Sequence, residues 1–212
     1  MRIGVTQRVE YISENREYRD CLDQRWSSLL AELNMTILPI PNRLDTIEDW
    51  LNTFKCDGYI LSGGNDLAEL ANAKNISKHR DQTEISILRY AQSRSLTVLG
   101  VCRGLQLMNS FFGGTLQRIT GHVATKHNIR VCFDQSNKFT TREVNSFHEW
   151  SILNNDLAHT LIPCAFDTND NIEAARHKVL NWLGIMWHPE RESYFKESDL
   201  EIIRSLFKRE LF

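Results

Sequence analysis

Proline, glycine, long apolar runs and an excess of charge are all scarce in this sequence. Four prolines and 10 glycines among 212 residues exclude collagen-like and low-complexity chains. No apolar run approaches the roughly 18 residues of a membrane span, and the first residues lack an apolar stretch of signal-peptide length. Lys and Arg number 25 against 27 Asp and Glu, so the basic excess of nucleic-acid-binding proteins is missing. We therefore expect a soluble, cytoplasmic protein that binds neither nucleic acid nor membranes.

The cysteines are few, odd in number and widely spaced. They form no CxxC pair, which excludes a simple disulfide framework and a zinc ribbon. We expect a reducing compartment, in which a special cysteine is more often a nucleophile than half of a disulfide. The hydrophobic fraction of 42%, with 10 Phe and 5 Trp, is enough for a folded core. The five cysteines are Cys21, Cys56, Cys102, Cys132 and Cys164.

Short apolar segments alternate with helical patterns along the chain. This alternation predicts an α/β fold, with a mostly parallel central sheet flanked by helices on both faces. The second half is richer in strands and turns. No linker, repeat or composition break divides the chain, so we expect residues 1–212 to form one domain. Expected strands are Arg2–Thr6, Thr36–Ile40, 58–62, Thr97–Val101 and 184–187, and expected helices are 20–33, 46–54, 81–93, 104–112 and 198–211.

The strongest local signal is Gly100-Val-Cys102-Arg-Gly104, which follows an apolar strand and opens a helix. This is the form of a nucleophile elbow, with cysteine in place of the usual serine. Glycines are needed because a sharp strand-to-helix turn leaves no room for side chains. The helix N-terminus and Arg103 are expected to favour the thiolate. The alternative is an ordinary buried cysteine at a strand end.

A cysteine nucleophile needs a base, and the base needs a partner that orients it. His188 ends the apolar run Gly184-Ile-Met-Trp187, and Glu190 follows two residues later. The pattern predicts a Cys102–His188–Glu190 triad. His148, in Asn-Ser-Phe-His, is the rival base.

Two further histidines, His122 and His127, lie in a polar stretch. Surface or hydrogen-bonding roles are expected for them, since no third metal ligand has persuasive spacing. We expect neither a metal nor an organic cofactor.

Acyl transfer also requires donors for the developing oxyanion. The loop Ser62-Gly-Gly-Asn-Asp66 follows an apolar strand, and its glycines let backbone N–H groups approach a substrate. One of these N–H groups, with that of Arg103, would form an oxyanion hole. Gly-Gly before Asn-Asp is also typical of an ordinary turn.

Together these motifs resemble the class I glutamine amidotransferase-like fold in its stand-alone hydrolase branch, peptidase family C26. The resemblance spans Ile3 to Glu190, and its motifs are Leu61-Ser-Gly-Gly-Asn65, Gly100-Val-Cys-Arg-Gly-Leu-Gln106, Asn145-Ser-Phe-His148 and Trp187-His-Pro-Glu190. It implies hydrolysis of a γ-glutamyl amide, with Cys102 as nucleophile, His188 as base and Glu190 as its partner. It further implies an oxyanion hole from the backbone of Gly64 and Arg103, and a substrate pocket lined by Gly63, Asn65, Gln106, Asn145, Ser146, Phe147 and His148.

A narrower resemblance is to the branch of this family that hydrolyses γ-glutamyl-CDP-amidate. It rests on the chain length, Gly4-Val-Thr-Gln-Arg8, Asn65-Asp-Leu67 and the two histidine motifs. It implies a small-molecule CDP conjugate as substrate, and a role in phosphoramidate modification of capsular or surface polysaccharide. Three alternatives remain open: a hydrolase of a polyamine-derived or peptide γ-glutamyl amide, a glutaminase subunit that passes ammonia to a separate synthase, and a catalytically silent regulatory domain.

A CDP leaving group needs cationic partners, and arginine suits phosphate because its planar fork binds two oxygens at once. The N-terminal stretch also contains five acidic residues, so a salt-bridged helix face is the alternative. The candidates are Arg8, Arg19 and Arg80, with Arg16, Arg25 and Arg103 as further possibilities.

Overall fold

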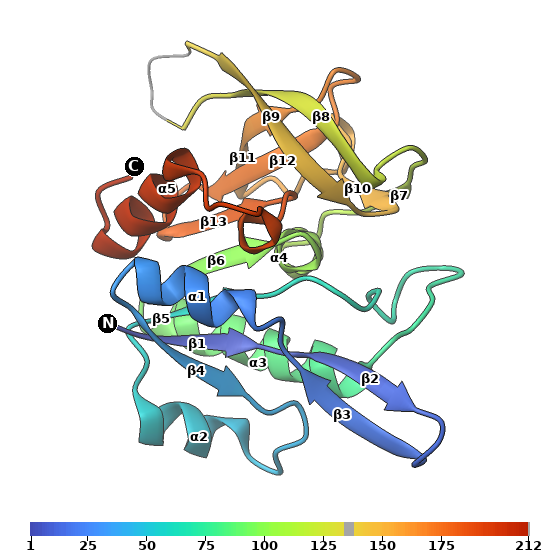
Figure 1. Ribbon diagram of the computed structural model, residues 1–212, viewed down its shortest axis with the longest axis vertical. Helices are drawn as coiled ribbons and strands as arrows, with labels where there is room; N and C mark the ends of the chain where they lie inside the picture. Colours follow the sequence, from blue (N-terminus) through green and yellow to red (C-terminus); the bar gives the residue numbers. More distant parts are fainter. Residues whose placement is uncertain (134–137, 212) are drawn as a thin grey trace.

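One sheet of nine strands runs through both halves of the chain (Figure 1). The computed structural model describes residues 1–133 and 138–211. Five neighbouring strands are parallel: β4 (Thr36–Ile40), β1 (Arg2–Thr6), β5 (Gly58–Leu61), β6 (Thr97–Val101) and β13 (Trp182–Ile185). The sheet continues with antiparallel strands: β12 (Ile172–His177), β11 (Leu161–Phe166), β8 (Val123–Val131) and β9 (Thr140–Phe147). The predicted α/β fold is confirmed, and the extra strands of the second half extend the same sheet.

Helices cover both faces of the parallel half because its strands are apolar on both sides. On β5, Ile60 packs with α1 (Arg25–Glu32) and α5 (Glu197–Lys208), whose apolar residues share one core cluster. Its neighbours Tyr59 and Leu61 point the other way, into a cluster with α2 (Ile47–Phe54), α3 (Lys78–Ser93) and α4 (Arg103–Phe111). Successive residues of a strand face opposite sides, so one strand serves both layers.

Two predicted helix starts are wrong. The helix predicted from residue 20 begins at Arg25, because Glu17–Cys21 forms strand β3 and pairs with β2 (Arg8–Ile12) in a hairpin. Little in the sequence indicates this hairpin, since most of its residues are polar and exposed. The helix predicted from residue 81 begins at Lys78, with the Ser77 hydroxyl accepting a hydrogen bond from the Arg80 backbone N–H (3.3 Å). Asp81 and Glu84 lie inside the helix instead of capping its start, and both carboxylates pair with Arg103.

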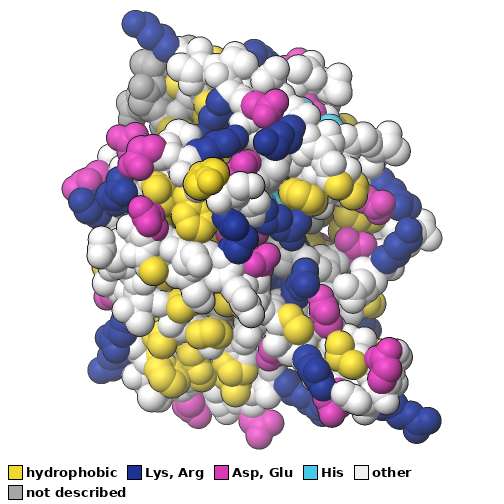
Figure 2. All heavy atoms as spheres, in the orientation of Figure 1, with side chains coloured by type: hydrophobic (Ala, Val, Ile, Leu, Met, Phe, Trp, Pro, Cys, Tyr) yellow, Lys and Arg dark blue, Asp and Glu magenta, His cyan; other side chains and the backbone are white. Residues whose placement is uncertain are grey.

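The remaining elements are short, and the surface carries charge of both signs. They are β7 (Gln117–Arg118), β10 (Trp150–Ser151) and the 3-10 turns η1 (Asn154–Asp156) and η2 (Pro189–Arg191). Figure 2 shows basic and acidic side chains interspersed over one face. Within residues 1–133 and 138–211, every helix is too short or too polar to span a membrane.

The loops that carry the predicted catalytic residues leave three neighbouring parallel strands at their carboxyl ends. Ser62 follows β5, Cys102 follows β6, and His188 follows β13 after two residues. These strands are adjacent in the sheet order β5-β6-β13. Ligands of open α/β sheets bind at the carboxyl ends of the strands. The fold therefore places the predicted catalytic residues at the edge where such sheets bind ligands.

Candidate active site

Cys102 occupies a sharp turn between β6 and α4, as the elbow pattern predicts. Its φ is 53° and its ψ −105°, a strained conformation for a residue with a side chain. A Cβ on Gly100 would lie 2.6 Å from the backbone carbon of Gly104, and one on Gly104 would lie 2.3 Å from the carbonyl oxygen of Leu61. Only glycine fits at either position, so the turn depends on both.

Cys102, His188 and Glu190 interact at one place. The positive charge of His188 acts on the Cys102 thiol, and His188 Nδ1 lies 2.7 Å from Glu190 Oε1. All three side chains are buried, with exposed fractions of 6%, 1% and 2%. The carboxylate accepts from Nδ1, so the other ring nitrogen is free to serve the sulfur.

The charges in this array favour a thiolate–imidazolium pair. Burial alone would raise the pKa of Cys102, but the positive charges of His188, His148 and Arg191 outweigh it and lower that pKa. Burial lowers the pKa of His188, but Glu190 and Cys102 outweigh it and raise that pKa to about 9. Both shifts favour the nucleophilic thiolate form of the sulfur.

Contrary to the prediction from sequence, the Arg103 guanidinium does not act on the Cys102 thiol. Its guanidinium is buried and pairs with Glu84 and Asp81. Burial would raise the pKa of Glu84, but Arg103 and Arg80 lower it and keep the carboxylate charged. The Arg103 charge is thus already neutralised by its partners. Its backbone N–H is the first of helix α4, and such N–H groups have no acceptor within their own helix.

Arg80 binds the loop after β5 rather than lining the cleft. It is fully buried and donates to the carbonyl oxygens of Ser62 (2.6 Å), Gly63 (3.0 Å) and Gly64 (2.9 Å). Its Nε donates to Glu84 (3.0 Å). With every nitrogen engaged, Arg80 fixes the Gly-Gly loop and is not available for a phosphate group, contrary to the prediction.

A cleft of about 280 Å³ opens beside Cys102. Seven of the predicted site residues line it: Gly64, Asn65, Cys102, Arg103, Gln106, Phe147 and His148. Residues outside the predicted set also line it: Asp66, Lys74, Asn75, Val123, Glu149 and Trp150. Most of these flank the selected motifs in sequence, so only proximity to a motif could have indicated them.

Three predicted pocket residues are placed differently. Asn145 bonds its amide to the backbone of His188, with Oδ1 accepting from N–H (2.8 Å) and Nδ2 donating to the carbonyl oxygen (2.8 Å). The Ser146 hydroxyl donates to the carbonyl oxygen of His122 (2.7 Å). Gly63 lies against the His188 ring, where a Cβ would come within 2.5 Å of Cε1. Asn145 and Gly63 contact the catalytic candidate His188, Ser146 binds the backbone of His122, and none of the three lines the cleft.

The arginines proposed for a phosphate leaving group have partners within the protein. Arg19 pairs with Glu17 on the exposed hairpin (2.7 Å), and Arg25 donates to the Glu190 carbonyl oxygen (2.6 Å). Arg8 pairs with Glu10 (2.8 Å), and its side chain also lies against Gly64. Their role toward a phosphate group stays a prediction.

Two other cationic side chains lie at or beside the cleft. Lys74 is part of its lining. The Arg191 guanidinium lies 4.5 Å from the ring centroid of Phe147, which lines the cleft and meets the His188 ring edge-on. Arg191 directly follows the Trp-His-Pro-Glu motif, and this position is the sequence feature that could have indicated its place beside the cleft.

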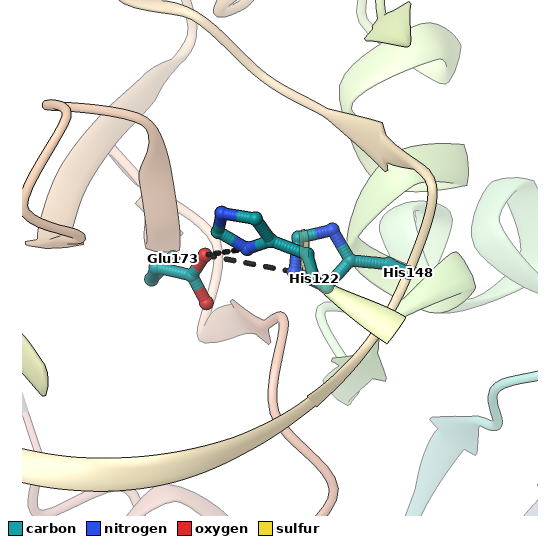
Figure 3. Close-up of side chains that lie close together, drawn as sticks. All are labelled: His122, His148 and Glu173. Carbon is teal, nitrogen blue, oxygen red and sulfur yellow. Dashed lines mark ion pairs between the residues drawn. The ribbon is translucent and has the colours of Figure 1, made fainter. Parts of the chain in front are cut away.

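His148, the rival base, faces a different carboxylate. Its Nδ1 lies 3.0 Å from the Trp150 carbonyl oxygen and its Nε2 lies 3.6 Å from Glu173 Oε1. Figure 3 shows the imidazoles of His122 and His148 both turned toward Glu173. The ligand atoms of these three residues lie within 4.8 Å of one another, a group that can hold a metal ion.

Known proteins resemble this chain in sequence and in fold. The γ-glutamyl-CDP-amidate hydrolase of Campylobacter jejuni is 32% identical over 210 residues, which cover 98% of each chain. A glutamine-hydrolysing GMP synthase subunit of Methanococcus maripaludis is 28% identical over 166 residues, covering 76% of this chain and 78% of that one. The crystal structure of a glutamine amidotransferase from Thermotoga maritima superposes with a TM-score of 0.67 at 14% identity, covering all of this chain and 86% of the other, which shows the shared fold.

The family is shown by a match over most of the sequence. Residues 3–190 match peptidase C26, a span that includes every predicted catalytic residue. The chain therefore belongs to the peptidase C26 family and is a cysteine-type hydrolase that acts on γ-glutamyl amides.

Proposed function

We propose that the chain hydrolyses γ-glutamyl-CDP-amidate to glutamate and cytidine diphosphoramidate. The observation that carries the proposal is the group of Cys102, His188 and Glu190, with His188 hydrogen-bonded to Glu190, beside a cleft whose lining includes Cys102 and Lys74. The similarity over nearly the whole chain to a hydrolase of this substrate supports the choice of leaving group. The nine-stranded sheet that joins both halves supports treating residues 1–212 as one hydrolase domain. A cytoplasmic location is part of the same proposal.

The first half-reaction transfers the γ-glutamyl group to sulfur. The Cys102 thiolate attacks the γ-carbonyl carbon, and the oxyanion is stabilised by the backbone N–H groups of Gly64 and Arg103. The C–N bond then breaks as the His188 imidazolium gives its proton to the leaving phosphoramidate nitrogen. Cytidine diphosphoramidate departs, and a γ-glutamyl thioester remains on Cys102.

The second half-reaction releases glutamate. His188, now neutral, accepts a proton from a water molecule that attacks the thioester carbonyl. The same two N–H groups stabilise the second oxyanion. Collapse expels the Cys102 thiolate, which restores the ion pair with His188 and frees glutamate. Glu190 keeps the proton-bearing Nδ1 oriented through both steps.

The diphosphate of the leaving group is negatively charged, and so is the chain, with a net charge of −2. Cationic side chains must therefore lie close to the diphosphate. Lys74 and Arg191 are the cations placed to provide this positive charge, with Arg8 next to Gly64 as a third. Phosphate oxygens form strong hydrogen bonds with such charged donors. Supply of cytidine diphosphoramidate fits a role in phosphoramidate modification of capsular or surface polysaccharide.

Glutamate release by the purified full chain tests this proposal. γ-Glutamyl-CDP-amidate, L-glutamine and γ-glutamyl-GABA are offered in parallel, with Cys102→Ala as the inactive control. We expect kcat/KM to be highest for the CDP conjugate by at least about 100-fold. Equal turnover of the simpler amides would refute the CDP assignment. Silence on all three substrates would favour a glutaminase that requires a synthase partner, as the similarity to a GMP synthase subunit suggests.

A further inference from the structure

A second buried cluster lies behind the wall of the cleft. Its members are His122, His127 on β8, His148 just after β9, and Glu173 on β12. Glu173 is completely buried and His148 is 3% exposed. The rings of His122 and His127 lie 4.8 Å apart between centroids, and those of His122 and His148 lie 5.0 Å apart. Three imidazoles thus surround one carboxylate (Figure 3 shows two of them).

The polar atoms that face one another in this cluster lack hydrogen bonds. Within the described part of the chain, His122 Nδ1, His127 Nε2, His148 Nε2 and both Glu173 oxygens are buried without such a partner. A buried polar atom left unpaired costs about 1–3 kcal/mol, so five at one place call for an explanation. An ion bound by the three nitrogens and one carboxylate oxygen would satisfy four of them.

The separations fit ligands of a metal better than direct hydrogen bonds. Glu173 Oε2 lies 3.5 Å from His127 Nε2, and Glu173 Oε1 lies 3.6 Å from His148 Nε2 and 3.9 Å from His122 Nδ1. Hydrogen bonds between nitrogen and oxygen are about 2.7–3.2 Å long. Metal bonds of about 2.0–2.1 Å in a tetrahedron place neighbouring ligand atoms about 3.4 Å apart. Two of the three distances already lie close to that value.

The outer nitrogens of two of these rings have the partners that metal-binding histidines use. His148 Nδ1 lies 3.0 Å from the Trp150 carbonyl oxygen, and His122 Nε2 lies 3.4 Å from Asp167 Oδ2. The Trp150 partner fixes the tautomer of His148 and leaves its Nε2 free to bind the ion, and Asp167 faces the outer nitrogen of His122. Asp167 is itself held, since its side chain accepts from the backbone N–H groups of Asn169 and Asn171 (2.8 Å each).

We propose that His122, His127, His148 and Glu173 bind a divalent transition-metal ion of the zinc type. Three imidazole nitrogens and a carboxylate oxygen make a complete tetrahedral set, as in structural zinc sites. The ion ties the β8–β9 hairpin to β12 and holds the Val123 and Phe147–Trp150 side of the cleft. This departs from the expectation that His122 and His127 lack a third ligand, because that ligand comes from distant strands. The proposal does not depend on which amide the enzyme hydrolyses.

Metal binding by the untagged full chain tests the proposal. After removal of metals with a chelator, the chain is titrated with Zn²⁺ in competition with a chromophoric indicator. We expect about one tightly bound ion per chain, with affinity reduced more than about 100-fold in His127→Ala and in Glu173→Gln. The control is His159→Ala, an exposed histidine outside the cluster, which keeps the wild-type affinity. Circular dichroism reports whether each variant is folded.

A second measurement needs no variant. Co²⁺ bound to the wild-type chain in place of Zn²⁺ is expected to give the intense visible absorption of a tetrahedral site. Zn²⁺ should also raise Tm, because an ion that binds only the folded chain stabilises it. Absence of Zn²⁺ binding, a Co²⁺ spectrum without that absorption, or equal affinity in wild type and folded Glu173→Gln would each overturn the proposal.

Discussion

Asn145 holds the backbone of His188 from both sides. Its Oδ1 accepts from the His188 N–H, and its Nδ2 donates to the His188 carbonyl oxygen, each at 2.8 Å. The same Nδ2 donates to Glu192 (2.9 Å). The position of the proposed base, His188, therefore depends on Asn145 of strand β9. This relationship joins the antiparallel half of the sheet to the catalytic array.

Asn145→Ala should lower kcat while leaving KM little changed. Loss of these buried hydrogen bonds costs about 1–3 kcal/mol, which corresponds to about 5- to 150-fold in rate if it falls on the position of His188. Steady-state kinetics of glutamate release measures both constants. Asn128→Ala, an exposed asparagine on β8, is the matched control. A rise in KM with unchanged kcat would instead indicate that Asn145 binds substrate.

The thiolate–imidazolium pair predicts how activity depends on pH. Since the pKa of Cys102 is lowered, kcat/KM should fall only when acid protonates the thiolate. Since the pKa of His188 is raised to about 9, its imidazolium is present below that pH and lost above it. The profile should therefore be bell-shaped, with its alkaline limb near pH 9.

Glu190→Gln should move that alkaline limb to lower pH by about one unit or more, because burial then lowers the pKa of His188 without the carboxylate to oppose it. The matched control is Glu197→Gln, an exposed residue of α5, which should leave the profile unchanged. An alkaline limb that stays in place in Glu190→Gln would show that His188 does not set it.

Arg80 should matter more for stability than for substrate binding. Arg80→Met leaves part of the charge of buried Glu84 uncompensated and frees three carbonyl oxygens of the Ser62–Gly64 loop. Breaking a buried ion pair costs about 3–5 kcal/mol of unfolding free energy. Urea unfolding measures this cost, and Arg89→Met on the exposed side of the same helix is the control. A cost below about 1 kcal/mol would contradict the role given to Arg80.

Lys74 and Arg191 should discriminate between substrates. Lys74→Ala and Arg191→Ala are expected to raise KM for γ-glutamyl-CDP-amidate about tenfold or more, with a smaller effect on L-glutamine, which has no phosphate. Arg19→Ala, on the hairpin and paired with Glu17, should change neither value. Kinetics with both substrates at one ionic strength provides the comparison. Equal effects on the two substrates would exclude a leaving-group role for these cations.

The catalytic motifs were predictable from sequence because their geometry is local. Gly100 and Gly104 flank Cys102 on one continuous strand-turn-helix, and Glu190 lies two residues from His188. Strands β1, β4 and β6 were predicted at their observed bounds for a similar reason, since each is a short apolar run.

Contacts between distant segments were not predictable. The β2–β3 hairpin pairs polar residues, so it lacks the apolar pattern that marks a strand. Glu84 lies four residues after Arg80 on the same helix, but its second partner Arg103 follows the next strand and is reached only through the fold. Glu173, which meets three histidines from the β8–β9 region, carries no local signal at all.

Cys102 is the residue on which the proposed chemistry depends most, as the nucleophile that attacks a γ-glutamyl carbonyl. The direct measurement is covalent labelling of the full chain by a diazoketone analogue of glutamine, followed by peptide mass mapping. We predict one label per chain, on Cys102, with labelling slowed by γ-glutamyl-CDP-amidate. Cys164, a buried thiol whose pKa is raised to about 11 by burial, should remain unmodified. A label on any other residue, or labelling of Cys102 that the substrate does not slow, would contradict this role.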